Sequence, residues 1–257
     1  MSYIDVHAHL NDKRYNGDIF SVVSAMKGAG VERVINSGFD FPSSVLAAEL
    51  SRIYDGFYFS AGVHPEETAG FDEETAENLF NLGKDEKCVA IGETGLDYHS
   101  EGYDKAVQYK AFERQMEIAD KLSLPFVVHS RSACKDTLDF LTEHKSLIKR
   151  GFLMHCYSES AEVAERLTEL GAYFSFGGVI TFKNARKEEV VASIPIDRLL
   201  SETDSPYLSP EPFRGTTNDP SRIPYIVKKL AEFKGVSLSE MARAIEENAK
   251  RLFNKCN

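Results

Sequence analysis

The sequence lacks several features that would place it in a specialised class of protein. It has no apolar run approaching the roughly 20 residues that span a bilayer, and it begins with the pattern of an ordered strand rather than a signal peptide. Its four cysteines form no CxxC pair, so neither a zinc knuckle nor a disulfide framework is indicated. It has no low-complexity segment and no linker rich in proline and glycine. We therefore expect a globular, cytoplasmic protein that is not attached to a membrane.

Basic residues are in the minority. The chain has 30 Lys and Arg against 40 Asp and Glu, which gives a net charge of −10. This balance disfavours a broad electrostatic grip on nucleic acid. It does not exclude a phosphate substrate, because cations bound in a pocket can reverse the sign of the local field. Nothing in the sequence indicates a stable protein partner.

What the chain does have is a repeating pattern of apolar runs separated by helix-like segments. The runs recur about every 30 residues, the size of one βαβ unit. They are YIDVHAHL, RVINSGF, FYFSAGV, CVAIGETGL, PFVVHSR, GFLMHCY, AYFSFGGVI and LLSETDSP. Eight such units predict an α/β fold, a (β/α)8 TIM barrel that occupies residues 1–257 as a single domain. Two amphipathic segments near the C-terminus, IPYIVKKLAEFKG and SLSEMARAIEENAKRLF, are expected to form helices that pack on the barrel.

The stretch IDVHAHL places two imidazoles two positions apart in an apolar run. In a helix, side chains at this spacing point to nearly opposite sides, whereas in a strand they share one face. As a strand, the stretch has Ile4, Val6, Ala8 and Leu10 on one face and Asp5, His7 and His9 on the other. The pattern therefore aims two histidines at one point.

Ionisable residues inside apolar strands are costly unless they are paired or bind metal. Here they gather near the ends of five runs, the end that carries the active site in barrels of this type. They are His7, His9, Glu93, His129, His155 and Asp204. Four neutral imidazoles and two carboxylates suit one or two divalent cations such as zinc, manganese or magnesium. The sequence thus predicts a metal site.

Each of these residues also has a simpler explanation. A lone histidine such as His129 or His155 is more often hydrogen-bonded in a core than bound to metal. Asp204 in ETDSP could be a helix N-cap, and Glu93 in IGETG could pair with an arginine. These explanations are less convincing when taken together, because five strands end in a potential ligand and none of the explanations accounts for the HxH pair.

Further polar residues are candidates for contacts with the substrate. His64 in GVHPEE ends the third run, where it could support the metal site or bind a substrate phosphate, or could be a plain turn histidine. Arg131 and Arg214 could bind phosphate oxygens bidentately or could equally form surface ion pairs. Cys156 follows His155 and is expected to point away from it, into the core.

Taken together, these motifs resemble the TatD family of metal-dependent deoxyribonucleases, within the amidohydrolase-like barrels. The matching pieces run from residue 5 to residue 253. They are DVHAHL, GVHPEE, AIGETGLDY, PFVVHSR, LMHCYS, SFGGVITFKNA, ETDSPYL, RGTTNDP and ENAKRLF. The resemblance implies two metal ions, one held by His7, His9, Glu93 and Asp204 and the other by Glu93, His129 and His155. It also implies exonucleolytic cleavage of DNA.

The chain departs from the usual family pattern at several positions outside the metal ligands. Tyr157, a further candidate substrate contact, begins the stretch YSE, where the family usually has Phe and then a small residue. Thr216 and Thr217 replace residues that are often basic, Asp219 replaces a glutamate, and Ser132 stands where Asp is common. Fewer cations in this loop make tight binding of long DNA less expected.

The leading hypothesis is a hydrolase that uses two divalent ions, Mg, Mn or Zn, to cleave DNA phosphodiester bonds from single-stranded or frayed ends. Asp204 is expected to act as a ligand and as the base that takes a proton from water, and Glu93 to bridge the ions. A second hypothesis is ester or amide hydrolysis at the same centre, for example on an aminoacyl-nucleic acid. A third is a metal-binding protein without turnover.

Overall fold

Eight parallel strands form the centre of the molecule in the computed structural model, which describes residues 1–256. They are β1 (Tyr3–Ala8), β2 (Val31–Ser37), β3 (Phe57–Ala61), β4 (Cys88–Asp97), β5 (Phe126–Arg131), β6 (Phe152–Met154), β7 (Ala172–Phe176) and β8 (Leu199–Ser201). Each strand pairs with the next in chain order. The predicted (β/α)8 barrel is therefore confirmed.

The residues that follow β8 return to β1 and bring the sheet close to full closure. The amide of Asp204 donates to the carbonyl oxygen of His7 at 3.0 Å, and the amide of His9 donates to the carbonyl oxygen of Ser205 at 2.7 Å. These bonds fix the end of β1 against the segment after β8. They also join two of the predicted metal-binding segments directly.

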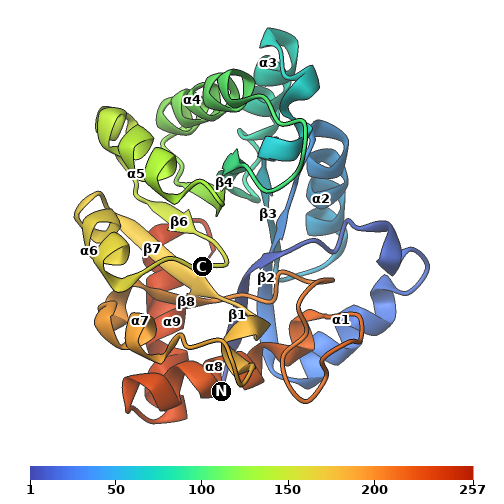
Figure 1. Ribbon diagram of the computed structural model, residues 1–257. Helices are drawn as coiled ribbons and strands as arrows, with labels where there is room; N and C mark the ends of the chain where they lie inside the picture. The colour runs from blue at the N-terminus through green and yellow to red at the C-terminus, as the bar shows by residue number, and fades with distance from the viewer. Residues whose placement is uncertain (257) are drawn as a thin grey trace.

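Helices surround the strands as an outer ring, which Figure 1 shows in chain order around the sheet. They are α1 (Ile19–Gly28), α2 (Phe41–Ile53), α3 (Glu73–Leu82), α4 (Lys105–Leu122), α5 (Cys134–Glu143), α6 (Ala161–Glu169), α7 (Glu188–Ser193), α8 (Ile223–Lys234) and α9 (Leu238–Leu252). Several begin at a side-chain cap, such as Asp40 for α2 and Ser237 for α9. In the part of the chain that the structure describes, no helix combines the length and apolarity needed to cross a membrane.

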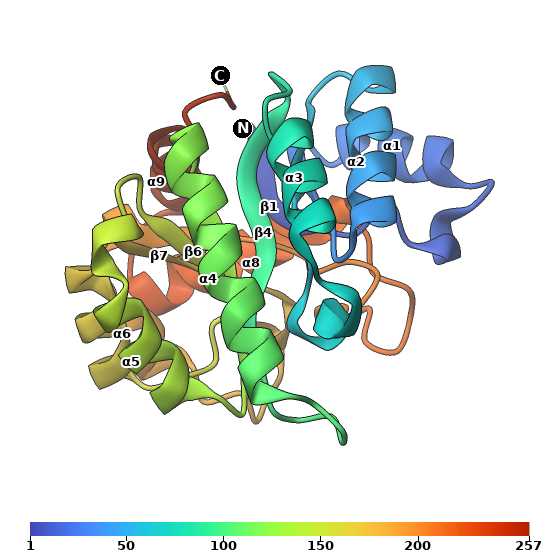
Figure 2. The same ribbon diagram turned by 90° about the horizontal axis from the view of Figure 1, so that it is seen from above.

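The core lies between the strands and this ring of helices. Strands β3 and β4 are buried along their whole length, as expected for a parallel sheet covered on both faces. The view in Figure 2 shows α3 and α4 running alongside β4. Phe126 of β5 and Phe152 of β6 stack with their ring centroids 5.3 Å apart. Replacing such a ring with alanine typically costs about 3 to 5 kcal/mol of stability, so the strands that carry the site rest on a well-packed base.

The two C-terminal helices pack on the barrel as predicted. Helix α9 lies against β1 and β8, and α8 lies against α9. The side-chain amide of Asn248 in α9 donates to the carbonyl oxygens of Ile196 and Leu199, both at 2.8 Å. These bonds tie α9 to the start of the strand whose far end leads to Asp204.

Candidate metal centre and substrate cleft

A cleft of about 690 Å³ opens at the C-terminal ends of the strands. Five of the six predicted metal ligands line it, and His7 lies beneath them with none of its side chain exposed. The ligands come from the ends of β1, β4, β5 and β6 and from the segment after β8. Parallel strands in a barrel place these ends on one face, which is why residues distant in sequence meet here.

The HxH pair converges as the strand alternation predicts. The Nε2 atoms of His7 and His9 lie 3.1 Å apart. Ser37, at the end of β2, binds both rings through their other nitrogens, with its hydroxyl 3.0 Å from Nδ1 of His7 and its carbonyl oxygen 3.0 Å from Nδ1 of His9. Because a carbonyl oxygen can only accept, Nδ1 of His9 carries the proton. A neutral His9 therefore presents a free lone pair on Nε2.

Glu93 stands between two groups of histidines and turns one carboxylate oxygen toward each. Its Oε2 lies 3.3 Å from Nε2 of His7 and 3.5 Å from Nε2 of His9. Its Oε1 lies 3.0 Å from Nδ1 of His129 and 2.7 Å from Nε2 of His155. The carboxylate is almost fully buried, so it needs these partners to remain ionised.

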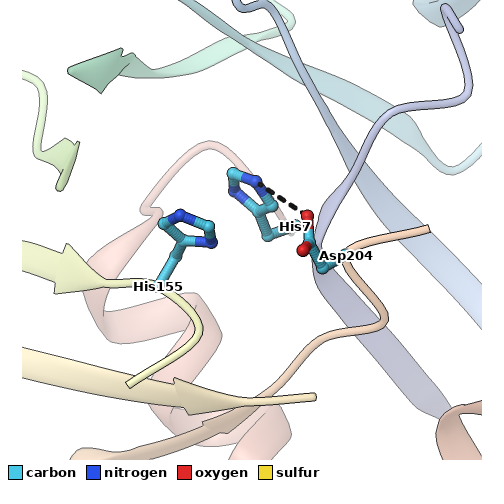
Figure 3. A group of neighbouring side chains, drawn as sticks. All are labelled: His7, His155 and Asp204. Carbon is cyan, nitrogen blue, oxygen red and sulfur yellow. Dashed lines mark ion pairs between the residues drawn. The ribbon is translucent and has the colours of Figure 1, made fainter. Parts of the chain in front are cut away.

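Asp204 completes the group on the β1 side. Its Oδ1 lies 3.5 Å from Nε2 of His9 and 3.8 Å from Nε2 of His7. Figure 3 shows the carboxylate facing His7, with the ring of His155 on the other side of that imidazole. Its φ of +52° lies in the left-handed region, a strained conformation that often marks functional positions. Asp204 caps none of the helices in residues 1–256, so the N-cap explanation is not supported.

The orientation of His129 is fixed from behind by Asp97. Nε2 of His129 lies 2.8 Å from Oδ2 of Asp97 and donates to it, so in the neutral ring Nδ1 is unprotonated and faces Glu93. A carboxylate that orients a metal-binding histidine in this way is a common arrangement in metalloproteins. The Nδ1 lone pair and the Glu93 oxygen repel each other at 3.0 Å unless a proton or a cation lies between them.

The pKa shifts in the cluster also indicate that it favours a bound positive charge. Burial alone would lower the pKa of His155, but the charges and hydrogen bonds of Glu93 and Glu202 together outweigh it and raise that pKa well above the usual value. Burial likewise would raise the pKa of Glu93, but the neighbouring imidazoles hold it well below the usual value. The carboxylates therefore draw positive charge into the cluster.

The donor atoms fit a divalent cation. Adjacent ligand atoms bound about 2.0 to 2.2 Å from zinc stand roughly 2.8 to 3.6 Å apart in octahedral or tetrahedral geometry. One group consists of His7, His9, Asp204 and Oε2 of Glu93, and the other of His129, His155 and Oε1 of Glu93. The distances between donor atoms within these groups run from 2.7 to 3.8 Å, so a small ion can be accommodated with slight adjustment. Donor atoms lie within 4.8 Å of one another in the set His7, His9 and Glu93, and also in the set His7, His155 and Asp204. Imidazole nitrogen with carboxylate oxygen suits zinc, manganese or magnesium.

His64 lies at the mouth of the cleft, where the sequence places it. Its Nδ1 accepts the backbone N–H of Glu66 at 3.2 Å, so a neutral ring carries its proton on Nε2. Burial lowers the pKa of His64 to about 3, and the adjacent His129 contributes to the same effect. Nε2 lies 3.5 Å from Oε1 of Glu93. His64 is thus a neutral hydrogen-bond donor beside the candidate metal centre.

The other predicted substrate contacts divide into two groups. Arg131 is exposed and lines the cleft. Arg214 lies outside the cleft lining, with its guanidinium stacked 4.4 Å from the ring centroid of Phe182. Tyr157 is only 4% exposed and donates to the carbonyl oxygen of Ser160 at 2.8 Å. The structure brings neither Arg214 nor Tyr157 to the cleft.

One core prediction is wrong. Cys156 lines the cleft instead of entering the core, because its φ of +45° breaks the strand alternation on which the prediction depended. Its amide donates to Oε1 of Glu202 at 2.7 Å, and that oxygen lies 3.7 Å from Nδ1 of His155. The backbone turn therefore connects the end of β6 to a buried carboxylate.

Sequence reasoning missed two buried acids, Asp97 and Glu202. Asp97 follows Glu93 by four residues, and Glu202 precedes Asp204 by two. Even spacings in a strand place side chains on the same face. Extending the alternation used for the HxH pair would have found Asp97, whereas Glu202 lies beyond the end of β8, where strand alternation does not apply.

The molecule is a parallel eight-stranded barrel, and its histidines and carboxylates gather at the C-terminal ends of the strands. These features define the class of metal-dependent hydrolases with an amidohydrolase-like fold. Within that class, the sequence matches the family model described as TatD related DNase over residues 4–254. The chain belongs to the TatD family, as the motifs predict.

Relatives and solved structures agree with this assignment. The chain is 43% identical over 250 residues to the metal-dependent hydrolase YabD of Bacillus subtilis, covering 97% of this chain and 98% of that protein. It is 36% identical over 258 residues to the metal-dependent hydrolase YcfH of Escherichia coli, covering 99% and 96%. The crystal structure of YJJV, a TatD homologue from Escherichia coli, superposes with a TM-score of 0.92 at 29% identity, covering 98% of each chain.

Proposed function

We propose that this metal-dependent hydrolase cleaves phosphodiester bonds in DNA, acting from the ends of single strands, and that two divalent cations bind at the site. The observation that carries the proposal is the position of Glu93, whose two carboxylate oxygens each face a separate pair of histidines. A single carboxylate between two groups of ligands is suited to bridge two ions. The family description, TatD related DNase, supports DNA as the substrate.

The residues divide into two ligand sets that share Glu93. His7, His9 and Asp204 lie on the side of Oε2, and His129 and His155 lie on the side of Oε1. When bound, two divalent cations polarise a phosphodiester, lower the pKa of water and stabilise the leaving oxygen. They would also offset the negative charge of the chain at the one place where a phosphate must lie.

The protein groups around this centre have complementary tasks. Asp204 is partly exposed to the cleft, so its carboxylate can accept a proton from an attacking water. His64 presents Nε2–H at the opposite side and can donate to a phosphate oxygen or to the leaving group. Arg131 lies at the rim, where a guanidinium can bind the next phosphate.

Preference for ends rests on charge and loop composition. The net charge of −10 and the neutral Thr216 and Thr217 give little attraction for a long duplex. A phosphate at the end of a flexible single strand can enter the cleft without bringing the rest of the polyanion close to the acidic surface.

The test compares turnover of a short single-stranded oligonucleotide and a nick-free circular duplex at equal nucleotide concentration, with Mg²⁺, Mn²⁺ or Zn²⁺ supplied in turn. We expect cleavage of the single strand and little of the circle, with activity abolished by chelation and restored by metal. Efficient cutting of the circle would refute end dependence. Turnover confined to carboxylic esters or aminoacyl-nucleic acids would refute the nuclease function and favour the second hypothesis.

A further inference from the structure

One wall of the cleft is apolar, although most of the lining is charged or polar. The apolar wall consists of Phe39, Tyr207 and Leu208, and the rings of Phe39 and Tyr207 lie beside His9. Tyr207 and Leu208 are each 45% exposed, which is unusual for large apolar side chains in a charged pocket. Exposed apolar surface inside a ligand cleft generally marks the place where an apolar part of the ligand binds.

The ring of Tyr207 is held in place. The guanidinium of Arg14 lies 4.3 Å from its centroid, and Asp12 fixes that guanidinium with hydrogen bonds of 2.9 and 3.0 Å. The backbone is fixed as well, because the amide of Tyr207 donates to the carbonyl oxygen of Asp204 at 2.9 Å. Asn218 binds the carbonyl oxygen of Tyr207 at 2.7 Å. A ring held in this way loses little conformational entropy when a ligand stacks on it.

The wall begins directly beside a metal ligand. The ring centroid of His9 lies 6.3 Å from that of Tyr207 and 6.0 Å from that of Phe39. A chemical group bound on this wall can therefore be joined through one small linking group to a phosphate at the metal centre. In a nucleotide, the sugar is such a linking group between phosphate and base.

Another part of the lining is acidic and, apart from the rim where Arg131 lies, unsuited to further phosphates. It carries Glu66, Glu67 and Asp97, whose negative charges repel a continuing polyanion. Stacking on an aromatic ring accommodates any nucleobase, because every base has a π-face. A planar, uncharged group attached close to a phosphate fits the apolar wall better than a second phosphate or a charged side chain does.

We propose that Phe39, Tyr207 and Leu208 form a subsite that stacks the unpaired base of the nucleotide whose phosphate lies at the metal centre. This inference rests on the proposed function, since it takes the substrate to be DNA. It also supplies a physical reason for selecting single strands, because a base inside a duplex is stacked on its neighbours and cannot reach the wall.

The subsite can be tested by binding, without any turnover. The metal-loaded chain is titrated by calorimetry with thymidine 5′-monophosphate and with 2-deoxyribose 5-phosphate, which carries the same phosphate without a base. Stacking of one base corresponds to roughly 5- to 150-fold in affinity, so the nucleotide should bind tighter by a factor in that range. Tyr207→Ala should remove most of the difference, and Tyr207→Phe should retain it.

Tyr225→Ala is the matched control, because Tyr225 is 43% exposed and lies outside the cleft lining. It should leave both affinities unchanged. Equal affinity of the parent chain for the two ligands, or a preference that survives Tyr207→Ala, would overturn the subsite. A preference lost in Tyr207→Ala together with no cleavage of any oligonucleotide would uphold the subsite and refute the nuclease function.

Discussion

Asp97 accepts a hydrogen bond from Nε2 of His129 at 2.8 Å, from the side of the ring opposite the candidate metal centre. This contact fixes the tautomer of His129 and increases the basicity of the nitrogen that faces Glu93. The acid lies on the same strand as Glu93, four residues further along, so β4 supplies both the proposed bridging carboxylate and the group that orients its neighbour.

Asp97→Ala should weaken metal binding by about 10- to 100-fold, because His129 loses the partner that orients it. The measurement is a metal titration of the purified chain followed by elemental analysis or calorimetry. Asp139→Ala is the control, since that acid lies on the surface in an ion pair with Lys135. Unchanged metal affinity in Asp97→Ala would show that the ring is held by other contacts.

Glu93→Gln should disrupt both ligand groups, because the amide cannot offer two anionic oxygens. The parent chain is expected to retain about two ions per chain after dialysis against divalent cations, and the variant to retain fewer than about one. Metal at about a hundredfold above its Kd should also stabilise the parent by about 2.7 kcal/mol. For a chain of this length that corresponds to a rise in Tm of roughly 5 to 10 °C. A parent Tm that does not respond to metal or chelator would contradict the site.

Asp204→Asn should lower turnover by roughly 10² to 10⁴, because the amide keeps one coordinating oxygen but cannot accept a proton. Single-turnover cleavage of a short oligonucleotide at saturating metal separates this effect from loss of the ion, which is determined in parallel. A fully loaded variant that cleaves within about tenfold of the parent would show that Asp204 is only a ligand. His64 would then be the next residue to test.

Glu202→Ala should destabilise the fold through buried groups left without partners. The glutamate is 0% exposed and accepts from the amide of Cys156 and the hydroxyl of Ser175. Each of the two unpaired buried donors costs about 1 to 3 kcal/mol, so the free energy of unfolding should fall by roughly 2 to 6 kcal/mol. Urea unfolding measures the change, with the exposed Glu165 as the control position for the same substitution. A loss below about 1 kcal/mol would mean that water replaces the carboxylate.

Cys156 should react slowly with alkylating reagents although it lines the cleft. Burial, together with the charges of Glu202 and Asp204, raises the pKa of its thiol well above the usual value. A raised thiol pKa leaves less thiolate at a given pH, so the rate of alkylation at pH 8 should be low and should rise about tenfold per pH unit. Peptide mapping after iodoacetamide treatment reports the site-specific rate, and the urea-unfolded chain gives the unperturbed value. Rapid labelling of Cys156 in the native chain at pH 7 would contradict this account.

The sequence determined the barrel and the identity of the chemical groups at its mouth. The period of about 30 residues and the alternation within each run are local properties, and they require only the geometry of strands and helices. The HxH pair is also local, because two histidines on one strand face converge wherever that strand lies. Glu93, His129, His155 and Asp204 were found because parallel strands in a barrel end on one face.

Tertiary structure alone decided how these groups are oriented and which others join them. Glu93 turns each oxygen to a different histidine pair only because β1, β5 and β6 lie at particular positions around it. Cys156 faces the cleft because a left-handed backbone turn reverses the alternation at the end of β6. Tyr207 became part of the cleft because Arg14, almost two hundred residues away in the sequence, holds its ring. Such contacts depend on packing between distant segments, and local periodicity carries no information about them.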